Sequence, residues 1–330
     1  MSSRSLPERA LFATLFFLRG LTGLFSQFAF EFADKVRQNV AMTVSTSSDL
    51  AIEINGLVKN YGDKVAVAGI DLTVAKGEIF ALLGPNGAGK TTTVEILEGF
   101  RNLSSGMVKV LGFDPATKGE AGRSWRNKIG IVLQSTTDAA DLTVQETVEH
   151  FSHYYQNPRD VDEVIDEVGL REKAKQFARN LSGGQRRRLD VALGIIGSPE
   201  LLFLDEPTTG FDPEARRAFW DLLNKLRSEG TTIFLTTHYL DEAEALADRV
   251  GVITNGKIIE IATPATLGNR VSAPARISWL ENGKIQEIES TNPTAEVQKL
   301  MSRLSGEIPQ LQIIRPNLED IYLRMIGENR

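Results

Sequence analysis

The sequence predicts an α/β fold built on a mixed sheet, and two kinds of apolar pattern support this. Short β-rich apolar runs at 201–204 and 232–236 are typical of central parallel strands covered on both faces. Upstream, the segments AIEINGLVKNY and IDLTVAK alternate apolar and polar residues, as half-buried strands do. A turn at Lys76-Gly77 then precedes a buried run over 79–83. Together these patterns predict a parallel core with an antiparallel sheet beside it.

The composition is that of a globular protein of 330 residues, 42% of them hydrophobic and none of them cysteine. A chain of this length can bury a large core, and we expect one sizeable domain plus a smaller one. The absence of cysteine excludes disulfides, thiolate zinc sites and a cysteine nucleophile, and favours a reducing compartment. The net charge of −6 argues against bulk nucleic-acid binding, and three histidines leave little room for a histidine-built metal centre.

Residues 1–41 differ from the rest of the chain. The run at 10–30 approaches the length of a membrane span, but Arg19 near its middle costs roughly 2.5–3.5 kcal/mol on insertion scales. Three interpretations stay open: a helix that docks on a membrane surface or a partner, a poor single span or signal anchor, and a wrongly assigned start of translation. The third is favoured, because Met42 opens a short polar segment that suits an N-terminus. Secretion is not expected, because no small-residue cleavage site follows.

Residues 42–267 are expected to form the large domain. In VGVITNGKIIEIA, Asn255-Gly256 supplies the pair of positive φ angles that a tight hairpin turn requires. Helical patterns at 144–155 and 161–168 predict a helical insert.

Residues 268–330 are expected to form a small α/β appendage. ARISWLENGKIQEIES predicts a hairpin, TAEVQKLMSRLS a helix and LQIIRP a strand. A last helix, NLEDIYLRMIG, is expected to be capped by Asn317 and to end at Gly327. Four residues are predicted to share its apolar face: Leu318, Ile321, Tyr322 and Met325.

The segment LLGPNGAGKTTTVEIL, at 82–97, passes from an apolar strand through a glycine-rich loop into a helical pattern and matches G-x-x-x-x-G-K-[ST]. Glycines let successive backbone N–H groups approach one anion, and the following helix adds its positive N-terminal end. We therefore expect Lys90 to reach the β- and γ-phosphates of a nucleotide, Thr91 to ligate Mg²⁺, and Thr92 to assist at the α- and β-phosphates. The remaining residues of this phosphate loop are Gly84, Pro85, Asn86, Gly87, Ala88 and Gly89.

The segment LLFLDEP places two carboxylates at the end of an apolar strand. We expect Asp205 to hold Mg²⁺ and Glu206 to act as general base toward the attacking water. Three further positions at strand ends fit the same chemistry. Gln134 is expected to contact Mg²⁺ or the attacking water. His238 is expected to contact the γ-phosphate, and Tyr61 is expected to stack on adenine.

The stretch LSGGQRRRLDVALGIIGSPELLFLDEPTTGFDP, at 181–213, together with the phosphate loop, Gln134 and His238, resembles the nucleotide-binding domain of ATP-binding cassette (ABC) proteins. The resemblance covers about residues 50–265. It implies a P-loop NTPase of ABC type, with a mixed core sheet, an antiparallel β subdomain and a helical insert. It also implies ATP as the nucleotide, and a pair of cassettes in which each ATP lies between the phosphate loop of one copy and the signature at 181–185 of the other.

Chemistry favours the same pairing. Ser182, Gly183, Gly184 and Gln185 stand at a predicted helix start, which makes a second anion-binding surface within one chain. One polyphosphate does not need two such surfaces from the same molecule. Asp212, in TGFDP, resembles the family's loop that signals between the two sites, although Phe211 replaces the usual leucine. The basic run at 186–188 is either a solvated face or part of the interface.

The single cassette and its C-terminal extension look like the ATPase subunits of drug and lipid exporters of the daunorubicin-resistance type. That resemblance implies a peripheral subunit on the cytoplasmic face of the membrane, a second copy as partner, and a separate permease that selects the substrate. No nucleic-acid partner is expected. A non-transport ABC ATPase acting on ribosomes or DNA is disfavoured, because there is one cassette and no heptad repeat between Lys90 and Asp205. An importer ATPase would differ only in its partner, and the C-terminal extension favours export.

Overall fold

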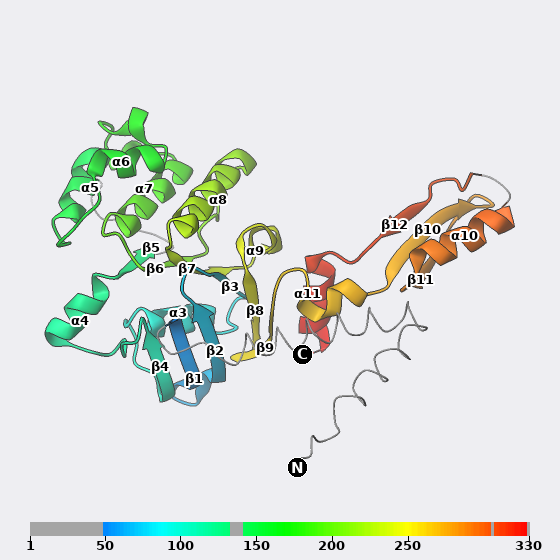
Figure 1. Cartoon of the computed structure of the whole chain (residues 1–330), viewed down its shortest axis with the longest axis horizontal. Helices are drawn as coiled ribbons and strands as arrows, with labels where there is room; N and C mark the ends of the chain where they lie inside the picture. The colour runs from blue at the N-terminus through cyan, green and yellow to red at the C-terminus, as the bar shows by residue number, and fades with distance from the viewer. Residues whose placement is uncertain (1–48, 133–140, 305–306, 329–330) are drawn as a thin grey trace, which may run out of the picture. The chain divides into compact units, whose positions relative to one another are not determined.

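The computed structural model describes residues 49–132, 141–304 and 307–328 (Figure 1). The predicted extension at 1–41 and Gln134 lie outside these ranges. The described residues from Leu50 onward belong to one compact unit, so the boundary expected between 267 and 268 stays a prediction. None of the helices in the described ranges combines the length and the apolar character that a bilayer span needs.

The core is a mixed sheet with the strand order β5-β6-β7-β3-β8-β9 in the described part of the chain. The first five strands are parallel, and β9 returns antiparallel to β8 through Asn255 and Gly256, whose φ angles are 49° and 74°. The predicted hairpin and its turn are confirmed. In chain order the strands are β3 (Ile79–Leu83), β5 (Ile129–Val132), β6 (Leu201–Asp205), β7 (Thr232–Thr237), β8 (Arg249–Thr254) and β9 (Lys257–Ala262).

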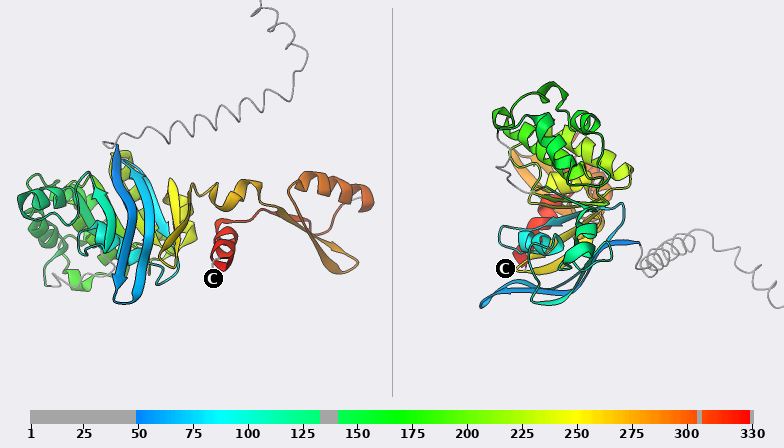
Figure 2. Two further views of the ribbon diagram at one scale, coloured as in Figure 1. Left: turned by 90° about the horizontal axis from the view of Figure 1, so that it is seen from below. Right: turned by 90° about the vertical axis from the view of Figure 1, so that its left-hand side faces the viewer.

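One face of this sheet packs against the predicted antiparallel sheet, seen from below in Figure 2. Its strands are β1 (Leu50–Tyr61), β2 (Lys64–Ala75) and β4 (Ser105–Val110), in the order β2-β1-β4. Alternate apolar residues of β1 point into a shared core with Phe80, Phe203 and Phe234. The helices α3 (Lys90–Leu97) and α4 (Gly119–Arg126) contribute to the same core, α4 through the fully buried Trp125.

The other face carries the helical insert (Figure 1). Because side chains alternate along a strand, Leu202 and Leu204 face these helices while Phe203 faces the antiparallel sheet. The predicted helices at 144–155 and 161–168 are confirmed, with slightly earlier ends. The helices of this layer are α5 (Val144–Ser152), α6 (Val161–Glu167), α7 (Gly183–Ile195), α8 (Pro213–Ser228) and α9 (Leu240–Leu246), with short 3₁₀ turns at η2 (Arg171–Lys173) and η3 (Ala178–Asn180).

The C-terminal residues form a further small sheet, β11-β10-β12, and α10 packs on it through Leu300, which shares a core with Ile277 and Trp279 of β10. Its elements are β10 (Ala275–Glu281), β11 (Lys284–Ser290), α10 (Pro293–Leu304) and β12 (Gln312–Ile314). These confirm the predicted hairpin, helix and strand.

The last helix, α11 (Leu318–Glu328), packs on the cassette and not on this small sheet. It lies beside the 3₁₀ segment η4 (Leu267–Ser272). Its predicted cap is confirmed, because Asp320 N donates to Asn317 Oδ1 at 2.8 Å, and the helix continues one residue past Gly327. The predicted apolar face is buried as expected: Leu318, Ile321, Tyr322 and Met325.

Candidate active site

A pocket of about 440 Å³ opens where the carboxyl ends of the core strands meet the start of α3. Parallel strands end at one edge of a sheet, which is where open α/β sheets bind ligands. The pocket brings together many of the residues predicted from sequence and adds Lys64 and Ala66, which were not predicted. Its lining comprises Tyr61, Lys64, Ala66, Asn86, Gly87, Gly89, Lys90, Thr91, Thr92, Asp205 and Glu206.

The phosphate loop is held by contacts that only glycine permits. Gly89 has a φ of 109°, and a Cβ there would lie 2.6 Å from the carbonyl oxygen of Ala66. A Cβ on Gly84 would lie 2.3 Å from the carbonyl oxygen of Ile253. The glycines therefore let the loop pack closely against the neighbouring backbone at the N-terminal end of α3, the part of a helix that binds phosphate.

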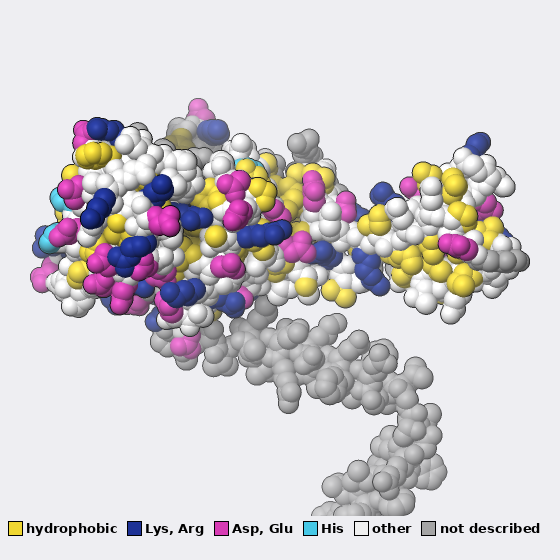
Figure 3. Space-filling view, turned by 90° about the horizontal axis from the view of Figure 1, so that it is seen from above, with side chains coloured by type: hydrophobic (Ala, Val, Ile, Leu, Met, Phe, Trp, Pro, Cys, Tyr) yellow, Lys and Arg dark blue, Asp and Glu magenta, His cyan; other side chains and the backbone are white. Residues whose placement is uncertain are grey.

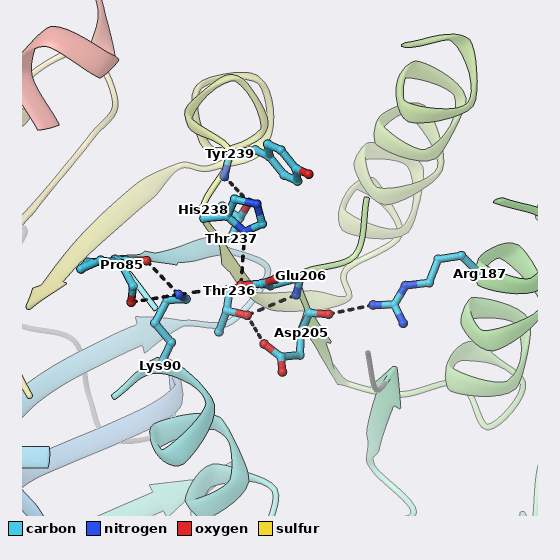
Figure 4. Close-up of polar contacts among 10 residues, drawn as sticks. Pro85, Lys90, Arg187, Asp205, Glu206, Thr236, Thr237, His238 and Tyr239 are labelled. Atoms are coloured by element: carbon cyan, nitrogen blue, oxygen red, sulfur yellow. Dashed lines mark hydrogen bonds and ion pairs between the residues drawn. The ribbon is translucent and has the colours of Figure 1, made fainter. Parts of the chain in front are cut away.

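Lys90 is the first residue of α3, and only 5% of it is exposed. Its Nζ donates to the carbonyl oxygens of Gly84 at 2.8 Å and Pro85 at 3.4 Å, and lies 3.8 Å from Glu206 Oε1 (Figure 4). Burial lowers the pKa of Lys90, while the charges of Glu206 and Asp205 act against that shift. The result is a cation enclosed by the loop and facing the carboxylates.

Thr236, on the neighbouring strand β7, holds the Asp205 carboxylate and the backbone of Glu206 at the end of β6. The Thr236 hydroxyl donates to Asp205 Oδ1 and accepts from Glu206 N at 3.2 Å (Figure 4). Glu206 has a φ of 46°, in the left-handed region that glutamate rarely adopts, and such strain gathers at functional sites. Its Oε1 lies 3.2 Å from His238 Nδ1, so the structure places Glu206 between Lys90 and His238.

Tyr61 lies at the rim of the pocket and is 41% exposed. Two cations lie over its ring, Lys59 at 5.1 Å and Arg101 at 5.5 Å from the ring centre. Stacking of a base on this ring stays a prediction.

The predicted signature residues do not line this pocket within one chain. Ser182 and Gln185 form a reciprocal cap at the start of α7: Gln185 N donates to Ser182 Oγ at 3.3 Å, and Ser182 N donates to Gln185 Oε1 at 3.1 Å. A Cβ on Gly183 or Gly184 would meet no described atom within 4 Å. Asp212 caps α8 by accepting from Ala215 N at 2.8 Å. The start of α7, at Ser182, Gly183 and Gly184, is thus a second surface outside the pocket.

Sequence reasoning missed a buried role for Arg187, which belongs to the basic run expected to be solvated or interfacial. Arg187 is 6% exposed, and its guanidinium donates to the carbonyl oxygens of Asp205 at 2.8 Å and Pro207 at 3.0 Å (Figure 4). Burial lowers its pKa. A helical pattern could have revealed it, because Arg187 shares the spacing i, i+3, i+4 with the buried Asp190 and Val191.

Two buried carboxyl groups were also missed. Glu242, on α9, is fully buried and faces the hydroxyls of Thr208 and Thr237; burial raises its pKa. Burial, reinforced by the charges of Asp205 and Glu95, raises the pKa of Glu98 to about 8. Neither residue carried a sequence signal, because its burial depends on elements far away in the chain.

Comparison with known proteins agrees with this geometry. The family model described as ABC transporter matches residues 67–209. The chain is 36% identical to a daunorubicin resistance ATP-binding protein of Streptomyces coeruleorubidus, over 86% of this chain and 98% of that protein. It is also 36% identical to a Nod factor export ATP-binding protein of Sinorhizobium fredii, over 86% and 88% of the two chains.

Solved structures show the same fold. A Clostridium perfringens subunit described as part of an ABC transporter complex is 30% identical, with a TM-score of 0.59 over 66% of this chain and 90% of that one. A bacterial ABC transporter cassette with 24% identity has the same TM-score over 64% and 98% of the two chains. The predicted α/β fold of ABC type is confirmed. With a phosphate loop, paired carboxylates at a strand end and relatives matched over nearly their full length, the chain belongs to the ABC transporter family, as one of its ATP-hydrolysing cassettes.

Proposed function

We propose that this chain is the ATPase subunit of an exporter, working as a pair of copies on the cytoplasmic face of the membrane with a separate permease. The observation that supports export is the match to the Nod factor export ATP-binding protein, which spans 86% of this chain and 88% of that relative and extends beyond the cassette residues 67–209. A family likeness confined to the cassette would leave transport direction open. Substrate choice is assigned to the permease, because the described pocket is suited to a nucleotide.

For hydrolysis, Glu206 is the proposed general base. As the water oxygen attacks the γ-phosphorus, its proton passes to a carboxylate oxygen of Glu206 and the bond to the ADP oxygen breaks. General base catalysis contributes about 10²- to 10⁴-fold. Lys90 would neutralise the β- and γ-phosphates. His238, 3.2 Å from Glu206, would bind the γ-phosphate and help to orient that carboxylate.

The donor set also fits Mg²⁺, which takes one or two protein carboxylates together with phosphate oxygens. The Asp205 carboxylate is oriented by Thr236, and the Thr91 hydroxyl lines the same pocket. We propose that Asp205 and Thr91 hold the ion, with Gln134 as a further predicted ligand. When bound, Mg²⁺ would neutralise charge on the phosphate oxygens.

The pairing of two copies is supported by the second surface. The capped start of α7 carries Ser182, Gly183 and Gly184; a Cβ on either glycine would meet no described atom within 4 Å, and none of these residues lines the pocket at Lys90. The N-terminal end of a helix attracts anions. We propose that it meets the ATP held by the other copy, with Asp212 at the same junction.

A permease partner is supported by an apolar pocket of about 360 Å³ between the helical insert, β5 and α4. Phe151, Tyr155 and Phe100, which is 65% exposed, line it. Arg126 and Arg186 bring positive charge to its lining and Asp190 brings negative charge. Such a pocket fits an apolar side chain carried on a partner's segment. On the face drawn in Figure 3, acidic and basic side chains are interspersed over the cassette, which does not favour nucleic acid.

The test is size-exclusion chromatography with light scattering on the full chain carrying Glu206→Gln, with and without ATP and Mg²⁺. We expect a dimer with ATP and a monomer without it, and co-purification with a polytopic membrane protein. Ser182→Arg, which places a bulky charge on the second surface, should abolish the dimer while leaving ATP binding to the monomer intact. A Glu206→Gln protein that stays monomeric with ATP and with the permease present would contradict the proposal.

A further inference from the structure

The helix α9 begins two residues after His238 and is held from two sides. On one side, Arg216 of α8 lies 2.8 Å from Asp241 Oδ2, with its guanidinium over the Tyr239 ring at 5.0 Å. On the other side, Arg270 of η4 lies 2.7 Å from Glu244 Oε1. A seven-residue helix has little stability of its own, so its position depends on such contacts.

Arg270 makes more than this ion pair. Its Nε donates to the carbonyl oxygen of Pro316 at 3.1 Å, and its Nη1 donates to the carbonyl oxygen of Pro264 at 3.4 Å. Pro316 comes just before the cap of α11, and Pro264 follows β9. One guanidinium, 23% exposed, therefore ties α9 to the segment just before the C-terminal appendage and to the start of α11 within it.

The helix α11 reinforces this connection. It contacts both η4 and α9, and its apolar face lies in the same core as Ala243 and Leu246 of α9. Gly268, next to the first residue of η4, has a φ of 57°, and a Cβ there would lie 2.3 Å from Ile321 Cγ2. The last helix of the chain is thus packed against the helix that follows His238.

His238 itself has few restraints. Its side chain is 40% exposed, and its ring packs on Tyr239 with the ring centres 4.1 Å apart. Since His238 immediately precedes the turn into α9, a shift of α9 moves the imidazole relative to Glu206, 3.2 Å away. Small displacements of a catalytic group are costly to the reaction rate.

We propose that Arg270 is a positioning residue for ATP hydrolysis: by tying α9 to the C-terminal appendage, it sets the position of His238. The appendage would then be able to change turnover without contacting the nucleotide. This inference rests on the role proposed for His238.

The test measures kcat and KM for ATP in the full chain carrying Arg270→Gln, Glu244→Gln or both. We expect kcat to fall by about 2- to 30-fold, the range seen for residues that act at a distance, with KM within about twofold of the wild type. The double variant should lose little more than Arg270→Gln alone, because the ion pair that Glu244→Gln breaks is already lost in Arg270→Gln. The matched control is Arg303→Gln, which breaks the ion pair of Arg303 with Glu281 inside the appendage and should leave kcat unchanged.

Two further measurements separate the outcomes. The melting temperature of Arg270→Gln should stay close to that of Arg303→Gln. A fall in kcat would then not be explained by unfolding. His238→Ala, assayed in parallel, should lose more turnover than Arg270→Gln. If His238→Ala is impaired while Arg270→Gln and Glu244→Gln turn over normally, the role of Arg270 is wrong. Normal turnover in His238→Ala would instead overturn the role proposed for His238, and this inference with it.

Discussion

Lys90 Nζ and Glu206 Oε1 lie 3.8 Å apart, although one group comes from the helix after β3 and the other from the end of β6. The pocket thus sets its buried cation beside the proposed base. The Glu206 carboxylate is held by the charge of Lys90 and by the left-handed backbone of Glu206 itself. Both constraints affect the result of substituting either residue.

Glu206→Gln should preserve the shape of the pocket and its contact with His238 but cannot accept a proton. We expect kcat to fall by about 10²- to 10⁴-fold while the Kd for ATP changes by less than about threefold. Phosphate release and equilibrium nucleotide binding measure the two quantities. Glu214→Gln, an exposed change in the first turn of α8, is the control. Unchanged turnover in Glu206→Gln would remove this residue as the base.

Lys90→Ala should weaken nucleotide binding itself. The change removes a charge-assisted contact to phosphate, which is worth about 10- to 100-fold in Kd. It also removes the donor to the Gly84 carbonyl and one of the two donors to the Pro85 carbonyl, which keeps the N–H of Ala88, so the loop should loosen. Calorimetric titration with ATP measures the effect. Lys64→Ala, which removes an equal charge from the same pocket, should cost less, and equal losses would mean that only net charge matters.

Glu98→Gln should change how stability depends on pH. The pKa of Glu98 is about 8 in the fold against an ordinary value of 4.5, so between these values the folded chain binds one more proton than the unfolded chain. Stability from this group therefore falls as the pH rises from 4.5 to 8. Glutamine removes that loss, so at pH 8 the variant should melt about 2–4 °C above the wild type, with a smaller difference at pH 5. Melting curves at both pH values, with the exposed Glu120→Gln as control, decide this. A constant difference between the two pH values would contradict it.

Gly268→Ala should destabilise the packing of α11. Gly62 provides the matched control, because its φ is 58° and a Cβ there meets no atom within 4 Å. Gly62→Ala should cost about 1–2 kcal/mol for the left-handed backbone alone. Gly268→Ala adds the contact with Ile321, an extra cost of about 1–3 kcal/mol for overpacking. Denaturant unfolding compares the two. Equal losses of unfolding free energy in the two variants would show that α11 shifts to accommodate the added methyl group at no cost.

The sequence was most informative where local chemistry decides the structure. The turn at Asn255 and Gly256 was predictable because few residue pairs adopt two positive φ angles, and the cap at Asn317 because its side chain serves the next turn of its own helix. The residues of the phosphate loop were found for the same reason, since their spacing follows from the geometry of an anion cradle.

What the sequence could not provide was the partner of each buried charge. Arg187 stands in a basic run that looks solvated, yet it bonds to carbonyls of a strand that follows later in the chain. Glu98 and Glu242 look like ordinary helix residues, and only tertiary packing buries them. The packing of α11 on the cassette could likewise not be predicted, because an apolar helix face does not identify the surface that it covers.

The cap at Ser182 and the buried Arg187 belong to the same helix and are separated by about 7.5 Å along its axis. In the proposed pair, the cap meets the triphosphate of the neighbour while Arg187 bonds to the backbone beside the chain's own carboxylates. A helix this short moves as a rigid rod, so a shift of β6 on loss of one phosphate would be felt at the opposite nucleotide. Under that arrangement the two sites would not hydrolyse ATP independently. The rate of turnover should rise sigmoidally with ATP concentration, with a Hill coefficient above one and at most about two.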